Sequence, residues 1–73
     1  MVKHLFNLKQ YEECIRDLDQ YLGVKNQSGS AWYVRGRAHY LLREYDQARS
    51  DLRQANQLGY KGDYSILDSM SGN

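Results

Sequence analysis

The chain repeats part of its own sequence at a spacing of 34 residues. When the sequence is shifted by 34 positions, five identities fall within positions 8–22, where chance gives about one. The identical pairs are Leu8 with Leu42, Tyr11 with Tyr45, Asp17 with Asp51, Leu18 with Leu52, and Gln20 with Gln54. Some mismatches within this stretch preserve charge or size, as where Lys9 meets Arg43, Glu12 meets Asp46 and Cys14 meets Ala48. The sequence therefore predicts two copies of one structural unit.

Apolar residues recur at the period of an amphipathic helix along most of the chain. The predicted helices cover residues 1–8 (the end of a helix), 11–22, 30–42, 45–58 and 63–70. Lys9 and Gln10 are expected to form a turn between the first two. No proline interrupts these runs. The prediction is an all-α fold of about five helices.

Small and polar residues mark the expected helix ends. Gly23 and Gly59 are expected to end the helices before them, because glycine favours the backbone conformation of a helix C terminus. Ser28 or Ser30 can cap the helix at 30–42, and Asp63 can cap the last one. Because the helix at 30–42 is apolar nearly all round, it should lie between two neighbours. The predicted division is a partial repeat at 1–27, a complete repeat at 28–62, a capping helix at 63–70 and a tail at 71–73.

The complete unit resembles the tetratricopeptide repeat, a helix–turn–helix unit of 34 residues. The positions that carry the resemblance are Trp32, Gly36, Tyr45, Ala48, Leu52 and Ala55, with Ile66 at the tryptophan position of a further unit. The resemblance implies antiparallel helix pairs stacked as a right-handed α-solenoid. It also implies that Gly36, Ala48 and Ala55 let two helices approach closely.

Three residues depart from the family pattern. Arg35 stands where the family usually has Leu, His39 where it usually has Tyr, and Gly59 replaces the stretch that leads to a closing Pro. We expect Arg35 either to extend its charged end to solvent or to pair with an acidic residue of the preceding helix, such as Asp19. We expect His39 to take the place of a core aromatic and to form a local hydrogen bond.

The composition argues against several classes of protein. A net charge of +1 argues against a protein held on nucleic acid by its overall field. No stretch approaches the roughly 18 apolar residues of a membrane span, and residues 1–8 do not resemble a secretory signal. The single cysteine, Cys14, cannot form an internal disulfide. We expect a cytoplasmic protein without a membrane association.

No set of residues suited to catalysis or cofactor binding stands out. Neither His4 nor His39 has a cysteine or carboxylate three or four residues further on, as a metal site on a helix requires. Asp17 and Asp19 diverge around a helix and do not form a catalytic pair. Cys14 is interpreted as a packed, unreactive thiol at a small-residue position. The sequence therefore predicts no enzyme, no metal and no cofactor.

The resemblance implies a protein that binds another protein or a peptide. In that family, the first helices of successive units line a concave groove. The equivalent residues here are Lys3, Phe6, Asn7, Tyr33, Arg37, Tyr40, Tyr64 and Leu67. Aromatic and arginine side chains on one surface are typical of binding hot spots. A clamp for a C-terminal carboxylate is not expected, because Val34 stands where the clamp needs Asn.

Two other functions are compatible with the sequence. One is self-association into a homo-oligomer, or stacking within a longer array, because the first unit lacks half of its helix pair and arrays usually need about three repeats. The other is RNA binding by the arginine and tyrosine side chains of the helix at 30–42. The near-neutral net charge makes RNA the less favoured alternative.

Overall fold

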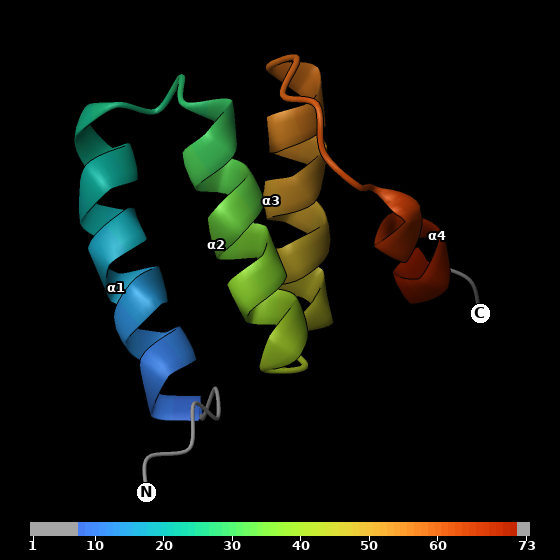
Figure 1. Cartoon of the computed structure of the whole chain (residues 1–73), viewed down its shortest axis with the longest axis horizontal. Helices are drawn as coiled ribbons and strands as arrows, with labels where there is room; N and C mark the ends of the chain where they lie inside the picture. Colours follow the sequence, from blue (N-terminus) through green and yellow to red (C-terminus); the bar gives the residue numbers. More distant parts are fainter. Residues whose placement is uncertain (1–7, 72–73) are drawn as a thin grey trace, which may run out of the picture.

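The computed structural model describes residues 8–71, which form four α-helices joined by short loops. The helices are α1 (Leu8–Val24), α2 (Gly29–Leu41), α3 (Tyr45–Gln57) and α4 (Ser65–Ser71). Figure 1 shows α1, α2 and α3 side by side with alternating chain direction, and α4 beyond α3. The all-α prediction is confirmed for the described residues.

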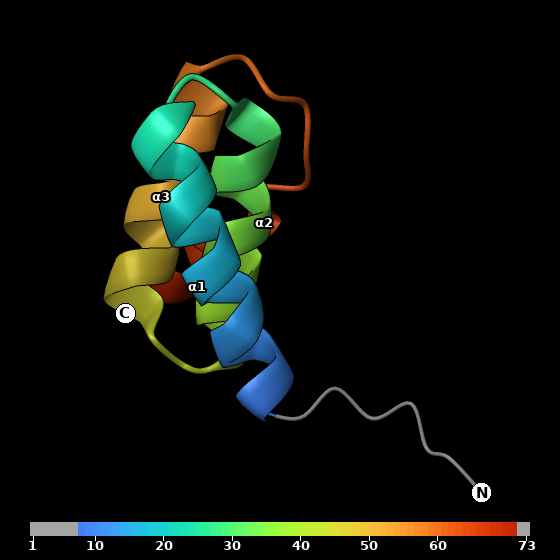
Figure 2. The same ribbon diagram turned by 90° about the vertical axis from the view of Figure 1, so that its left-hand side faces the viewer.

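Helix α2 lies between α1 and α3 and packs against both (Figures 1 and 2). Its buried residues are Ala31, Gly36 and Ala38. All three are small, so the helix surface is flat enough for close neighbours on two sides. The prediction that this segment is sandwiched between neighbouring helices is confirmed.

The tightest contact of the fold is between α2 and α3. On α3, the side chains of Ala48, Leu52 and Ala55 are completely buried. A Cβ atom added at Gly36 would come within 2.9 Å of Leu52 Cγ and 3.0 Å of Asp51 Cβ. The two helices therefore approach to a distance that only glycine permits at position 36, as its place in the repeat predicts.

The ends of α2 and α3 are fixed by local hydrogen bonds. Ser28, one of the two predicted caps, accepts a hydrogen bond on its Oγ from the backbone N–H of Ala31 at 3.3 Å. After α3, Gly59 has a φ of 85°, and the N–H groups of Gly59 and Tyr60 bond back to the last turn of the helix. The prediction that Gly59 ends this helix is confirmed.

The turn after α2 has the same hydrogen-bond pattern but no glycine. Arg43 has a φ of 64°, in the left-handed region that arginine rarely adopts. Its N–H donates to Tyr40 O at 3.0 Å, and the N–H of Glu44 donates to His39 O at 2.9 Å. These bonds make the turn a Schellman motif with arginine at the glycine position.

Several predicted boundaries are wrong. Lys9 and Gln10 do not form a turn but lie in the first turn of α1, because both are good helix formers and neither is followed by a capping residue. Gly23 does not end α1, which continues to Val24 with Gly23 in a helical conformation. Helix α2 begins and ends one residue earlier than predicted, and α3 ends one residue earlier. The helix predicted at 1–8 lies outside the described residues except for Leu8, which begins α1.

Candidate functional site

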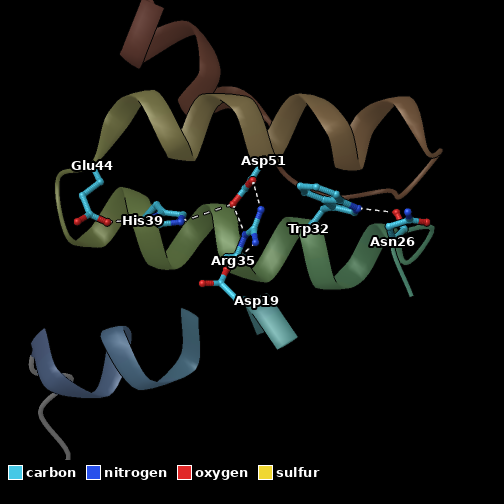
Figure 3. A network of polar contacts seen from close by, with 7 residues as sticks. All are labelled: Asp19, Asn26, Trp32, Arg35, His39, Glu44 and Asp51. Atoms are coloured by element: carbon cyan, nitrogen blue, oxygen red, sulfur yellow. Dashed lines mark hydrogen bonds and ion pairs between the residues drawn. The ribbon is translucent and has the colours of Figure 1, made fainter. Parts of the chain in front are cut away.

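A chain of charged side chains crosses the helices at the centre of the fold (Figure 3). Arg35 of α2 donates from Nε to Asp51 Oδ2 at 2.7 Å and from Nη2 to Asp51 Oδ1 at 2.8 Å. Its Nη1 donates to Asp19 Oδ1 of α1 at 2.6 Å. One guanidinium group therefore joins α1, α2 and α3, using the planar fork geometry that suits arginine to carboxylates.

The two carboxylates differ in their environment. The Asp51 side chain is 5% exposed, whereas that of Asp19 is 56% exposed. Asp51 is thus a buried charge that depends on its partner, because an unpaired carboxylate in the interior is strongly unfavourable. The hydrogen bond from Asp51 is the largest cause that raises the pKa of Arg35 above its ordinary value, and Asp19 adds to it.

Two further contacts extend this network along α2. His39 lies 3.8 Å from Asp51 Oδ2 through Nε2, and its Nδ1 lies 2.7 Å from Glu44 Oε1 in the next turn. The guanidinium of Arg35 lies 4.9 Å from the ring centroid of Trp32. The Trp32 Nε1 donates to the backbone oxygen of Asn26 at 2.8 Å, which ties the network to the α1–α2 loop.

Of the two alternatives for Arg35 the pairing is confirmed, and so is the local hydrogen bond expected of His39, but the sequence analysis missed Asp51. Arg35 pairs with Asp19, and His39 forms a local hydrogen bond to Glu44. The signal for Asp51 was present, because it lies three residues after Ala48 and four before Ala55 and therefore shares their buried face. A carboxylate on such a face requires a cationic partner from the neighbouring helix.

A second cluster joins α2 to the loop before α4. Tyr33 lies 5.0 Å from Tyr60 and 5.6 Å from Tyr64 between ring centroids, and Arg37 lies over the Tyr33 ring at 5.7 Å. The Tyr33 hydroxyl accepts from the N–H of Asp63 at 2.9 Å and from Arg37 Nη1 at 3.2 Å. Burial raises the pKa of Tyr64, and Tyr33 and Tyr60 add to that shift.

Helix α4 begins at Ser65, two residues later than predicted, and its first residue is held by Asp63. Its Oδ1 accepts from the Ser65 N–H at 3.0 Å and from the Ser65 hydroxyl at 2.7 Å. The backbone hydrogen bond from Ser65 is the largest cause that lowers the pKa of Asp63 below its ordinary value. The charged carboxylate is therefore the form that caps the helix.

The structure brings only part of the predicted groove together. Tyr33, Arg37 and Tyr64 are in one cluster, whereas the Tyr40 ring packs on Tyr45 at 5.6 Å. Leu67 is half-buried on α4. The predicted residues Lys3, Phe6 and Asn7 lie outside the described part of the chain. Tyr33 makes contacts within the fold, whereas the sequence analysis expected it to contact a partner.

An open groove runs between α1 and α2, and of the predicted groove residues Arg37 lines its smaller part. Its larger part has a volume of about 590 Å³ and its smaller part about 220 Å³, and both parts are lined by Cys14 and Val34. Val34 is 44% exposed, and Leu41 in the smaller part is 47% exposed. Cys14 is half-buried, so it is less enclosed than the packed thiol that the sequence predicts.

The described residues contain no group of three or more His, Cys, Asp or Glu side chains that could hold a metal ion. Within residues 8–71, no helix has the length and apolarity to cross a membrane.

The class that the helices and contacts define is an all-α protein of consecutive antiparallel helices, compatible with the tetratricopeptide arrangement. No protein-family model matches the chain, and no solved structure matches it.

Curated proteins do match. The chain is 40% identical over 53 residues to Hsc70-interacting protein 1 and to Hsc70-interacting protein 2 of Drosophila melanogaster, an alignment that covers 73% of this chain and 14% of each relative. It is 32% identical over 56 residues to a 58 kDa phosphoprotein of Plasmodium berghei, covering 77% of this chain and 13% of the relative. The chain thus spans only about one seventh of the length of these relatives. The named interaction of the two Drosophila proteins points to protein–protein interaction as the class of function.

Proposed function

We propose that the chain is a tetratricopeptide-type interaction module that binds a partner protein on the face formed by α2 and α4. The observation that carries this proposal is the cluster of Tyr33, Tyr64 and Arg37, where the guanidinium of Arg37 lies over the Tyr33 ring and that ring packs against Tyr64. Arg37 is exposed, Tyr64 is half-buried directly before α4, and Leu67 is half-buried within α4. Such a surface offers both apolar area and a charged hydrogen-bond donor to a peptide or helix.

The likeness to the two Drosophila proteins supports Hsc70 as the partner to test first. In this proposal, Arg37 contacts an acidic side chain or a carbonyl oxygen of the partner, and Tyr40, Tyr64 and Leu67 supply apolar contact. Tyr33 orients Arg37 through its hydroxyl and ring, so its contribution to binding is indirect. A protein with such a module acts as an adaptor, without catalysis of its own.

The test is a titration of the purified chain with purified Hsc70, followed by isothermal calorimetry. We expect Arg37→Glu to weaken binding by at least about tenfold, as loss of an arginine hot spot does. The matched control is Arg53→Glu, which makes the same change of charge at an exposed position of α3. Equal binding by all three proteins, or no binding by the unaltered chain, contradicts the proposal.

A further inference from the structure

The loop between α3 and α4, residues 59–64, packs as a strap on the first half of α2. A Cβ atom added at Gly29 would lie 2.8 Å from Tyr60 Cβ, and one added at Gly62 would lie 2.5 Å from Tyr33 Cε1. Both distances are shorter than real Cβ contacts, so the strap and α2 touch at two places that exclude a larger side chain. Figure 1 draws the strap in orange between α3 and α4.

The Tyr33 hydroxyl connects the strap to Arg37. It accepts hydrogen bonds from the backbone N–H of Asp63 at 2.9 Å and from Arg37 Nη1 at 3.2 Å. The Tyr33 ring also packs against Tyr60, at 5.0 Å between ring centroids, and against Tyr64 at 5.6 Å. The side chain that orients Arg37 is thus itself held by contacts with the strap.

The position of α4 depends on the strap, because α4 has few other attachments. Among the described helices, α4 packs only on α3. Its first residue, Ser65, donates from both its N–H and its hydroxyl to Asp63 of the strap. Segments with few packed contacts open locally at a low cost in free energy. The strap and α4 can therefore leave α2 together while the three central helices stay folded.

We infer that docking of the strap on α2 completes the partner surface, and that release of the strap and α4 removes it. The inference rests on the proposed function and adds its regulation. In the docked state, Tyr33 holds Arg37, and the strap places Tyr64 against the Tyr33 ring. In the released state, Tyr64 leaves α2 and the Tyr33 hydroxyl loses its bond to Asp63. A partner that binds only the docked state has an apparent affinity proportional to the docked fraction, and its binding favours docking.

The variant that tests this inference is Gly62→Ala, because an added methyl group does not fit while the strap lies on Tyr33. Either the strap or the Tyr33 ring must move, and either movement breaks the hydrogen bond between Tyr33 and Asp63. The proposed contact residues stay unchanged in this variant, so a loss of binding is not the loss of a contact side chain. The matched control is Gly23→Ala, where an added Cβ has no atom within 4 Å.

Two measurements separate docking from binding. Hydrogen exchange of the free chain should be at least about threefold faster in α4 for Gly62→Ala than for the unaltered chain, and nearly unchanged in α2 and α3. Calorimetric titration with purified Hsc70 should show binding at least about fivefold weaker for Gly62→Ala and equal to that of the unaltered chain for Gly23→Ala. Bound Hsc70 should in turn slow exchange in α4 of the unaltered chain, because binding and docking are linked.

Exchange in the free chain also tests the link to Arg37 without a partner. We expect Arg37→Ala to speed exchange in α4, because the Tyr33 hydroxyl loses a hydrogen bond that helps to hold it in place. The control Arg53→Ala, at an exposed position of α3, should leave α4 unchanged.

Unchanged exchange in α4 for Gly62→Ala or for Arg37→Ala overturns the inference. Equal, measurable Hsc70 affinity of Gly62→Ala and the unaltered chain also overturns it. If the unaltered chain does not bind Hsc70, the proposed function fails, whereas faster α4 exchange in both variants still supports the coupling of the strap to Arg37.

Discussion

Single residues decide how the three central helices are held together, and Arg35 is the clearest case. Its two carboxylate partners lie on opposite sides, one buried and one exposed. Because a buried charge without its partner is far more costly than an exposed one, the two carboxylates contribute very unequally to the stability of the fold.

We expect Asp51→Ala to destabilise the chain by about 3 kcal/mol or more, because it leaves the half-buried Arg35 without its bidentate partner. Asp19→Ala should cost less than about 1 kcal/mol, since that side chain is largely in water. Urea unfolding followed by circular dichroism measures both. Where Asp51→Ala proves too unstable to study, Asp51→Asn keeps the shape and should still cost more than Asp19→Ala. Equal effects for the two positions would show that burial does not set the strength of these contacts.

For single residues, the sequence predicted the close helix contact, which depends on small side chains. Gly36, Ala48 and Ala55 were assigned to a close helix contact from their positions in the repeat, and the structure confirms it. Asp51 and the internal role of Tyr33 were missed. The hydrogen bond between Tyr33 and Asp63 joins residues 30 positions apart, and it depends on a loop path that no local pattern encodes.

At the scale of helices and turns, the two helix C termini at Arg43 and Gly59 have the same hydrogen-bond pattern but different strain. Gly59 adopts its positive φ without steric cost, whereas Arg43 adopts a similar conformation with a side chain. Arginine at position 43 is therefore a residue that does not favour the left-handed backbone conformation of this turn.

We expect Arg43→Gly to stabilise the chain by about 0.5–1 kcal/mol, the net of relieved backbone strain and the greater flexibility of glycine in the unfolded chain. Thermal unfolding followed by circular dichroism measures the change. The reciprocal variant Gly59→Ala should destabilise by about 1 kcal/mol through strain alone, because an added Cβ there has no atom within 4 Å. Loss of stability in Arg43→Gly contradicts this account of the turn.

Helix existence was more predictable than helix ends. Four predicted segments contain the four described helices, and Ser28 and Gly59 mark boundaries through specific hydrogen bonds. Lys9 and Gln10 were assigned to a turn but lie in α1, whereas Arg43 and Glu44 do form a turn. Neither pair contains glycine, so composition alone could not separate a turn from a continuous helix.

Across the whole molecule, the helices are unequally connected. Helix α2 packs against two neighbours, whereas among the described helices α4 packs only on α3, and it is further held through the Tyr33 hydroxyl and the loop. A Cβ added at Gly62 would lie 2.5 Å from Tyr33 Cε1, so the loop runs directly over that ring. The attachment of α4 thus depends on a few contacts, which favours local opening without global unfolding.

We expect hydrogen exchange to be fastest in α4 and slowest where α2 meets α3. Tyr33→Phe removes the hydroxyl that holds Asp63, and should speed exchange in α4 while leaving α2 and α3 nearly unchanged. Hydrogen–deuterium exchange with mass spectrometry measures each helix separately. Tyr40→Phe is the matched control, because no hydrogen bond of the Tyr40 hydroxyl is found among the described residues. Uniform acceleration of exchange in all helices after Tyr33→Phe would show that α4 unfolds only with the rest.

The placement of Trp32 gives this chain a built-in optical reporter. It is the single tryptophan, its ring lies beside the Arg35 guanidinium, and its indole N–H bonds to the α1–α2 loop. Indole emission shifts in wavelength when that hydrogen bond is exchanged for water, and a nearby cation alters its intensity. Ultraviolet fluorescence of the unlabelled chain can therefore follow the central ion pairs directly, in stopped-flow mixing as well as at equilibrium.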